Sequence, residues 1–383
     1  MPTTVFDLQT TEDPRDFVHR TVQALVEGQV VGIPTDTVYG LAAHALCVDA
    51  VERLCEMKGR SSTAPLAISV RSRDEAGDLF GELSPLARRL THRCWPGPLT
   101  LVLPCDSPRS AASQLPEGVR RRITGEGNCI GFRVVDHRIL SYIHRFLAAP
   151  LVLTSANISG KPAPSDAGGV LDQLDDTLPL LIDDGPTRYG GASTVVRIRD
   201  NRWEMLREGA IERAAMNQFV KPVVAVVCTG NTCRSPMAET LLREQIRKKY
   251  GSEDAVRVLS AGVAAGNGSG ASPQAVEVMG GRGLDLTGHS SRQLDDEVMN
   301  VADLVLTMTR GHRAAILAAW PNMHDRVHTL RRDGGDVTDP VGMPVETYLQ
   351  CAEQIDSELA SWLETMGDDL LATEHEKPQG DSE

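Results

Sequence analysis

The sequence predicts an α/β protein built from two domains. Its 383 residues exceed the size of one ordinary small domain. Short apolar runs alternate with helix-like segments over residues 14–211. A second alternation starts at Val223, where an apolar run leads through a loop into a helix-like stretch ending at Lys249. Alternation of this kind predicts sheets covered by helices in both halves.

The first half begins with residues 14–27, which have the spacing of an amphipathic helix. Residues 51–57 and 85–93 are also helix-like, and the turn Trp95–Pro98 follows the latter. The expected strands are the apolar runs 30–34, 66–70, 99–103, 130–135, 151–154 and 193–198. Neither GxxxxGK[ST] nor GxGxxG occurs, so a nucleotide in this half would need another binding device.

The second half has expected strands at 223–227 and 326–330 and expected helices at 236–249 and 346–366. We place the domains at 1–213 and 222–366, with a short linker between them. The polar, acidic residues 367–383 are expected to be a disordered tail.

Bulk composition excludes several functional classes. The net charge of −13 gives no broad basic face for duplex DNA. No run of eighteen apolar residues occurs, so no membrane span is expected, and Met1–Arg15 does not resemble a secretory signal. The eight cysteines are scattered without C-x-x-C pairs, which favours a reducing cytoplasm over a disulfide framework or a metal site.

The most informative motif is the run from Cys228 to Ser235, CTGNTCRS, between the strand expected at 223–227 and the following helix. Backbone N–H groups of such a loop converge at a helix N-terminus and bind anions. The same field favours thiolate over thiol at Cys228, which makes it a nucleophile near neutral pH. Arg234 offers a planar fork for two phosphoryl oxygens. The spacing predicts a cysteine-based phosphoryl-transfer site rather than a chance Cys-x5-Arg.

Other residues of this loop have supporting roles. Ser235 can donate a hydrogen bond to the sulfur. Gly230 is suited to an unusual backbone angle or a close approach to ligand, and Asn231 to a left-handed position. A phosphoryl-cysteine mechanism also needs a general acid. Asp339, before Pro340, is the candidate and is expected in an extended or turn segment, although an Asp-Pro pair is usually only a turn.

The first half carries polar side chains where its expected strands and helices end. Individually each is more often a loop residue or a cap. Together, four cations with small hydroxyl and amide donors suit a polyanionic substrate and a small zwitterion. The residues concerned are Thr35, Asp36, Thr37, Tyr39, Lys58, Arg60, Arg133, Ser155, Asn157, Ser193, Thr194 and Arg207.

From Val223 to Met366 the chain resembles the low-molecular-weight protein phosphatases. The resemblance rests on the Cys228 loop, Ser260–Gly262, Gly288–Gln293, Ala302–Met308 and Asp339–Pro340. It implies a metal-free site with Cys228 as nucleophile, Arg234 as phosphate clamp and Asp339 as general acid. It implies loop support from Thr229, Gly230, Asn231, Thr232, Cys233, Ser235, Ser260 and His289. It also implies a protective disulfide between Cys233 and Cys228, against the alternative that Cys233 is a small buried apolar residue.

The substrate of this half is expected to be a phosphoprotein. Tyrosine-directed members of the family usually have isoleucine or leucine at Thr232 and an aromatic residue at Val341. A hydroxyl at Thr232 suits a planar guanidinium and matches the arginine phosphatase branch. We therefore favour phosphoarginine over phosphotyrosine.

From Pro14 to Ile211 the chain resembles the YrdC-like threonylcarbamoyl-AMP synthases. The resemblance rests on Ile33–Leu41, Lys58–Arg60, Trp95–Thr100, Thr154–Gly160, Ser193–Val195 and Leu206–Gly209. It implies a twisted mixed sheet and the conversion of threonine, bicarbonate and ATP to threonylcarbamoyl-AMP and pyrophosphate, with Mg²⁺. ATP contacts are implied for Lys58, Arg60, Ser155, Asn157, Ser165 and Arg207, and threonine contacts for Thr35, Arg133 and Ser193.

The implied product serves tRNA modification, so tRNA or the threonylcarbamoyl-transfer machinery is an expected partner. Ala64 departs from the family pattern by losing a polar side chain, whereas Ser165 keeps a hydroxyl at its position. The alternative is that this half is a nucleotide-binding or double-stranded RNA-binding module that steers the phosphatase.

Overall fold

The computed structural model describes residues 2–11, 13–59, 65–81, 83–105, 110–175, 177–366 and 373–374. The chain divides into two compact units, Met1–Phe219 with Ala372–Glu383, and Val220–Leu371. The expected disordered tail, 367–383, lies outside the described residues except for Thr373 and Glu374. These two residues form strand β16, which pairs in parallel with β11.

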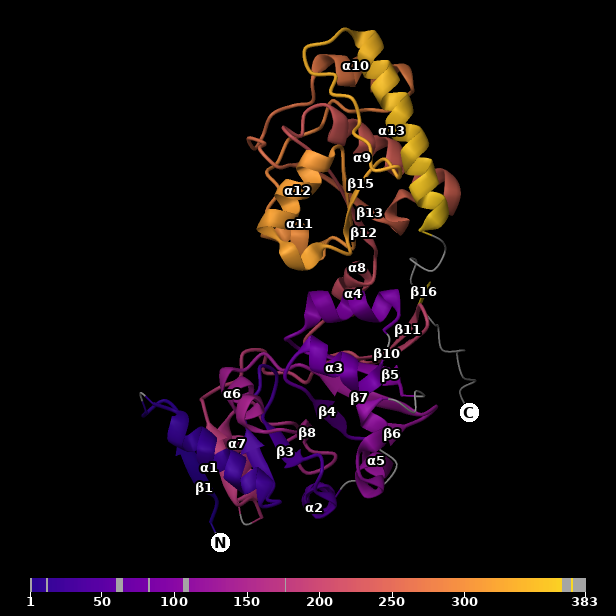
Figure 1. Ribbon diagram of the computed structural model, residues 1–383. Coiled ribbons are helices and arrows are strands. Elements are labelled where there is room, and N and C mark those ends of the chain that lie inside the picture. Colours follow the sequence, from indigo (N-terminus) through magenta and orange to yellow (C-terminus); the bar gives the residue numbers. More distant parts are fainter. Residues whose placement is uncertain are drawn as a thin grey trace. The chain divides into compact units, whose positions relative to one another are not determined.

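The first unit is built on a mixed twelve-stranded sheet (Figure 1). The order is β1-β9-β2-β3-β8-β4-β7-β5-β10-β11-β16, with β6 paired to β7. The strands are β1 Thr4–Asp7, β2 Val31–Ile33, β3 Gly40–His44, β4 Ala67–Ser69, β5 Leu99–Pro104, β6 Thr124–Gly125, β7 Cys129–Arg133, β8 Leu151–Ser155, β9 Leu180–Asp183, β10 Thr194–Arg199, β11 Arg202–Arg207 and β16 Thr373–Glu374. The helices are α1 Arg15–Val26, α2 Val48–Lys58, α3 Arg73–Phe80, α4 Pro85–Cys94, α5 Glu117–Ile123, α6 Arg138–Phe146, α7 Ala167–Leu174 and α8 Arg213–Phe219, with a 3₁₀ turn at Ala111–Gln114.

Strand alternation gives this sheet one packed face and one face that lines a cavity. On β7, Gly131 and Arg133 line the cavity, whereas Phe132 points the other way and contacts Phe80 of α3, with ring centroids 4.8 Å apart. Successive side chains of a strand point to opposite faces, so a row of alternate residues can form a site while the others form the core. At the β1 end, α1 and α6 cover the sheet through a core that includes Leu25 and Ile143.

The second unit has a four-stranded parallel sheet in the order β13-β12-β14-β15. Its strands are β12 Val223–Cys228, β13 Arg257–Gly262, β14 Leu304–Thr307 and β15 Val327–Thr329. Its helices are α9 Arg234–Tyr250, α10 Pro273–Gly281, α11 Asp296–Val301, α12 Arg310–Ala319 and α13 Val345–Thr365, with 3₁₀ turns at Glu253–Ala255 and Pro321–Met323.

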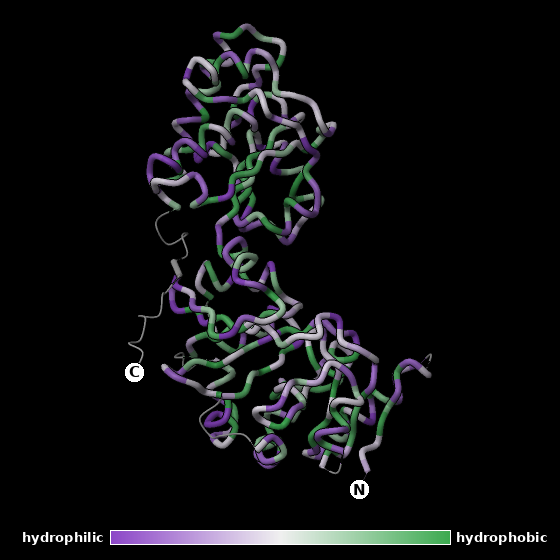
Figure 2. The backbone as a smooth tube through the Cα atoms, turned by 180° about the vertical axis from the view of Figure 1, so that it is seen from behind, coloured by the Kyte–Doolittle hydropathy of each residue, from purple (hydrophilic) through white to green (hydrophobic). Residues whose placement is uncertain are grey.

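Both faces of this second sheet are covered, because β12 is apolar throughout. Val224 and Val226 pack toward α9, α10 and α13, whereas Ala225 and Val227 pack toward α11 and α12. Figure 1 shows these two helical layers on opposite sides of the strands, and Figure 2 shows apolar segments concentrated in the middle of this unit. All six residues of β12 are buried, as a parallel strand between two helical layers requires.

The fold class predicted from the sequence is confirmed in both units. Each expected helix and strand quoted above overlaps an observed one. The linker expected between the domains contains a helix, α8. Within the part of the chain that the structure describes, no helix is long and apolar enough to cross a membrane.

Candidate active sites

The phosphate loop of the second unit begins where β12 ends and runs into α9. The Cys228 sulfur lies 3.3 Å from the backbone nitrogen of Asn231 and 3.0 Å from the Ser235 hydroxyl. Ser235 is fully buried and Cys228 is 3% exposed. A backbone N–H and a hydroxyl aimed at sulfur at the start of a helix stabilise negative charge on it.

Asn231 braces the loop through all its polar atoms. It has φ of +53°, in the left-handed region expected for it. Its amide nitrogen donates to the hydroxyls of Ser235 and Ser260, each at 2.9 Å. Its side-chain oxygen accepts from the Arg292 backbone N–H at 2.8 Å, and its carbonyl lies 2.7 Å from Nε2 of His289. The structure therefore brings Ser260 and His289 to the loop.

Arg234 and Asp339 meet at the same loop although they are far apart in sequence. An Arg234 terminal nitrogen donates to the Asp339 carboxylate at 2.5 Å, and the other donates to the Val337 carbonyl at 3.3 Å. Arg234 is 4% exposed, whereas half of the Asp339 side chain is open to solvent. Asp339 follows a segment without regular structure, as the adjacent Pro340 predicts.

His312 is a residue of this site that sequence reasoning missed. Its Nε2 lies 2.8 Å from the Thr229 hydroxyl, so a side chain of α12 contacts the first residues of the loop and supports them. Burial lowers the pKa of His312, and the nearby Arg234 charge lowers it further. Both effects favour the neutral imidazole over the charged one. The only sequence signal was a histidine at the start of a helix after β14, which is too weak to identify the contact.

Gly230 lacks the unusual backbone angle that was one of the two roles expected for it. It is not among the glycines with positive φ, and a Cβ there would meet only the Thr232 hydroxyl, at 3.7 Å. A close approach between backbone segments occurs at Gly262, at the end of β13. A Cβ on Gly262 would lie 2.4 Å from the Thr229 carbonyl and 2.9 Å from the Asn231 nitrogen, so the loop packs against a position without a side chain.

Thr232 and Cys233 lie on the α10 and α13 side of the loop. The Cys233 sulfur is within hydrogen-bond distance of the hydroxyls of Thr232, Ser272 and Tyr348, at 3.7, 3.4 and 3.3 Å. Cys228 and Cys233 are both free thiols in this structure.

The first unit has a cavity of 430 Å³ on the open face of its sheet. This volume lies within the range of small-molecule sites, about 300–1,000 Å³. Five of the nine residues expected to contact ATP or threonine line it together, namely Thr35, Arg133, Ser155, Ser193 and Arg207. Lys58, Asn157 and Ser165 are not in its lining, and Arg60 and Ala64 lie outside the described residues.

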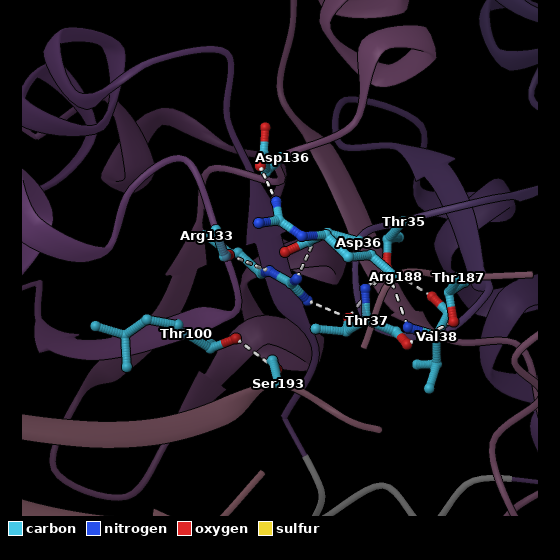
Figure 3. A network of polar contacts seen from close by, with 12 residues as sticks. Thr35, Asp36, Thr37, Val38, Thr100, Arg133, Asp136, Thr187, Arg188 and Ser193 are labelled. Carbon is cyan, nitrogen blue, oxygen red and sulfur yellow. Dashed lines mark hydrogen bonds and ion pairs between the residues drawn. The ribbon is translucent and has the colours of Figure 1, made fainter. Parts of the chain in front are cut away.

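Arg133 lies in this cavity and forms hydrogen bonds to three residues (Figure 3). It donates to the Asp36 carboxylate at 2.5 Å, the Thr37 hydroxyl at 2.9 Å and the Gly97 carbonyl at 3.0 Å. Burial raises the pKa of Asp36, against the opposing charge of Arg133. Among the described residues, these hydrogen bonds leave one N–H on each terminal nitrogen of Arg133 for a ligand.

The remaining polar groups are held by a loop network. The Ser193 hydroxyl lies 3.0 Å from both the Thr100 hydroxyl and an Arg207 terminal nitrogen. The Thr35 hydroxyl donates to the Val38 carbonyl at 2.6 Å, which closes the turn after β2. Figure 3 shows Thr35 and the Thr100–Ser193 pair around Arg133.

Lys58 does not line the cavity but contacts Ser155, which does. Its ammonium, buried at 2% exposure, donates to the carbonyls of Ser155 and Asn157 at 2.5 and 2.8 Å and to the Asn157 side chain at 3.1 Å. The Ser155 hydroxyl donates to the same Asn157 oxygen at 2.6 Å. Lys58 and Asn157 therefore position the loop after β8, on which Ser155 lines the cavity.

A buried pair, Ser69 and His144, was also missed from the sequence. Ser69 lines the cavity from β4, and its hydroxyl lies 3.1 Å from Nε2 of His144 on α6. Burial lowers the pKa of His144 to about 4, with a smaller contribution from Arg71. The pair could not be found from sequence, because the strand and the helix are joined only by the tertiary fold.

Neither site has a ready-made metal centre in the described ranges, where no group of three or more His, Cys, Asp or Glu side chains could hold an ion. Mg²⁺ usually takes few protein ligands and is held largely by substrate phosphates.

The two folds and sites define a YrdC-type nucleotide-handling domain joined to a cysteine-loop phosphatase domain. Family models agree with this division. Residues 23–209 match the Sua5/YciO/YrdC model, described as telomere recombination, and residues 223–372 match the low molecular weight phosphotyrosine protein phosphatase model.

Individual relatives divide in the same way. Threonylcarbamoyl-AMP synthases of Bacillus subtilis and Pyrococcus abyssi are 35% and 39% identical over 57% and 58% of this chain, which spans 60% and 68% of their lengths. A protein-arginine-phosphatase of Bacillus subtilis is 40% identical over 35% of this chain and 89% of its own. A solved structure of a substituted Pyrococcus abyssi Sua5 is 25% identical, with a TM-score of 0.50, over 80% of this chain and 99% of its own.

The chain therefore belongs to the Sua5/YrdC threonylcarbamoyl-AMP synthase family in its first unit and to the low-molecular-weight phosphotyrosine/arginine phosphatase family in its second.

Proposed function

We propose that this protein is a bifunctional enzyme. Its first unit makes threonylcarbamoyl-AMP from threonine, bicarbonate and ATP, and its second unit hydrolyses phosphoproteins, with phosphoarginine preferred over phosphotyrosine. The observation that carries the phosphatase half is the Cys228 sulfur, placed between the Asn231 N–H and the Ser235 hydroxyl at the start of α9.

In the phosphatase unit, the Cys228 thiolate attacks phosphorus and forms an S–P bond, while the bond to the leaving group breaks. Arg234 and the loop N–H groups hold the phosphoryl oxygens. Asp339, which Arg234 keeps beside the loop, gives its proton to the leaving group. Asp339 then takes a proton from water, whose oxygen attacks phosphorus. Phosphate leaves and the Cys228 thiolate is regenerated.

The preference for phosphoarginine rests on Thr232. Its hydroxyl lies at the loop beside Cys233, where a polar group suits a guanidinium better than a phenyl ring. Substitution Thr232→Ile should shift the ratio of kcat/KM for phosphoarginine and phosphotyrosine peptides toward phosphotyrosine on the order of tenfold. An unchanged ratio would show that Thr232 does not select the substrate.

In the synthase unit, the threonine amine attacks the carbon of bicarbonate, a C–O bond breaks, and water leaves to give a carbamate. A carbamate oxygen then attacks the α-phosphorus of ATP, and pyrophosphate leaves. We assign the threonine carboxylate to Arg133 and Ser193 and the nucleotide phosphates to Arg207, because all three line the cavity and Arg207 bonds to Ser193. Catalysis here consists of positioning and charge stabilisation.

One purified sample tests both halves. Threonine-dependent release of pyrophosphate from ATP and hydrolysis of phosphopeptides are measured for wild type, Lys58→Ala and Cys228→Ser. Lys58→Ala should reduce only pyrophosphate release, because it frees the loop that carries Ser155. RNA binding by a wild-type protein that releases no pyrophosphate would instead support a binding module that steers the phosphatase.

A further inference from the structure

Arg197 lines the cavity of the first unit near its β10–β11 edge. It pairs with Val102 of β5, and Val102 pairs with Gly131 of β7, two residues before Arg133. Given ordinary strand spacing and rise, Arg197 and Arg133 are separated by about 10 Å across the sheet and about 7 Å along it. Arg197 therefore serves a part of the cavity that Arg133 does not occupy.

The guanidinium of Arg197 is weakly engaged. One terminal nitrogen lies 3.4 Å from a Glu204 oxygen and the other 3.3 Å from a Glu126 oxygen. Strong guanidinium–carboxylate pairs are shorter, about 2.7–2.9 Å, and often bidentate to one carboxylate. The Arg197 Nε is buried and has no hydrogen-bond partner among the described residues. A buried donor left in this way is unusual and suggests a missing acceptor.

We propose that Arg197 binds the terminal phosphates of the nucleoside triphosphate and then the departing pyrophosphate. The proposal rests on the synthase function proposed above. This half of the chain has no glycine-rich phosphate loop, so cationic side chains in the cavity lining are the natural partners of those phosphates. Arg133 also pairs with Asp36 and Arg207 also bonds to Ser193, so Arg197 adds a third arginine to the lining.

The surroundings of Arg197 allow a phosphate to replace its carboxylate partners. The Glu126 side chain is 82% exposed, so it can turn into solvent when a phosphate arrives. A planar guanidinium matches the paired oxygens of a phosphate better than two separate carboxylates.

The position of Arg197 also bears on the chemical step. As the carbamate oxygen bonds to the α-phosphorus, the bond from that phosphorus to the bridging oxygen breaks. Its electron pair stays on the oxygen of pyrophosphate. A cation at the terminal phosphates stabilises this growing charge, so its loss lowers kcat as well as affinity.

The test measures binding of inorganic pyrophosphate and of AMP to the full chain by calorimetry, in the absence of threonine. Arg197→Gln should weaken pyrophosphate binding on the order of tenfold and leave AMP binding unchanged, with Arg197→Lys in between. Glu126→Gln should strengthen pyrophosphate binding, because it removes a carboxylate that competes for Arg197. Arg199→Gln is the matched control, since Arg199 lies two residues further along β10 and outside the cavity lining.

Equal pyrophosphate affinity in wild type and Arg197→Gln would overturn the proposal. So would a matching loss of AMP binding, which indicates a disturbed cavity, or a matching loss in Arg199→Gln, which indicates a general charge effect. Turnover separates the two proposals. Suppose that the wild-type protein binds pyrophosphate through Arg197 but releases no pyrophosphate from ATP when threonine is added. The phosphate site would then stand, and the synthase function would be refuted.

Discussion

The phosphate loop of the second unit draws its cysteine, its arginine and its backbone donors from eight consecutive residues, Cys228 to Ser235. The cavity of the first unit instead collects its polar groups from β4, β5, β7, β8, β10 and β11 and from the turn after β2. The loop acquires its shape from a strand that ends where a helix begins. The cavity acquires its shape from strand register, so each of its residues depends on several neighbours.

This difference predicts how substitutions act. In the loop, one atom carries the chemistry, so a single change should abolish one activity and spare the fold. In the cavity, binding is shared among many contacts, and changes should have graded effects that combine affinity with stability.

The largest expected effect is that of Cys228→Ser. Replacing the nucleophile with a much less reactive hydroxyl should lower phosphopeptide hydrolysis by at least about 10³-fold. Thermal unfolding and threonine-dependent pyrophosphate release should stay as in wild type, because serine is similar in size. Retention of more than a tenth of the hydrolysis would mean that another group is the nucleophile.

Asp339→Asn should have the next largest effect and should depend on the leaving group. A positioned general acid contributes about 10²–10⁴-fold. We expect a loss in that range for phosphoarginine peptides, whose leaving group must gain a proton. The loss for p-nitrophenyl phosphate, which leaves as a stable anion, should be much smaller. Equal losses for the two substrates would show that Asp339 acts only by holding Arg234.

The buried His144 gives a third prediction, which concerns the stability of the unit that holds the cavity. Burial lowers its pKa to about 4 in the folded unit, whereas an unfolded histidine titrates near 6.5. The unfolded chain therefore binds a proton that the folded unit excludes. The free energy of unfolding is therefore unaffected by this group above about pH 6.5 and decreases as the pH falls toward 4. The decrease is about 2 kcal/mol at pH 5 and about 3 kcal/mol in all.

Urea unfolding of the first unit at pH 7.5 and pH 5 measures this loss. His144→Gln should show a smaller drop in unfolding free energy between the two pH values than wild type does. His19→Gln, at an exposed position, is the control. An identical pH dependence in His144→Gln and wild type would contradict the assignment.

The two sites also differ in how far they could be predicted. The Cys228 loop was recognisable because strand, loop and helix follow one another in the chain. Its local geometry was still partly misjudged, since Gly230 lacks the unusual backbone angle expected for it, and a close contact with the loop lies at Gly262, on another strand. In the cavity, Arg133 and Ser193 were identified through a family resemblance, but Ser69, His144 and Arg197 carried no sequence signal.

Sequence alone determined the two α/β units, the order of their elements and the nucleophile loop, because these depend on hydrophobic periodicity and on groups adjacent in the chain. Only the tertiary structure decided which distant side chains meet: His312 at Thr229, Gly262 against the loop, Lys58 behind Ser155 and Arg197 at the cavity edge. The physical reason is that such contacts depend on strand order and register, which long-range packing sets and no short segment encodes.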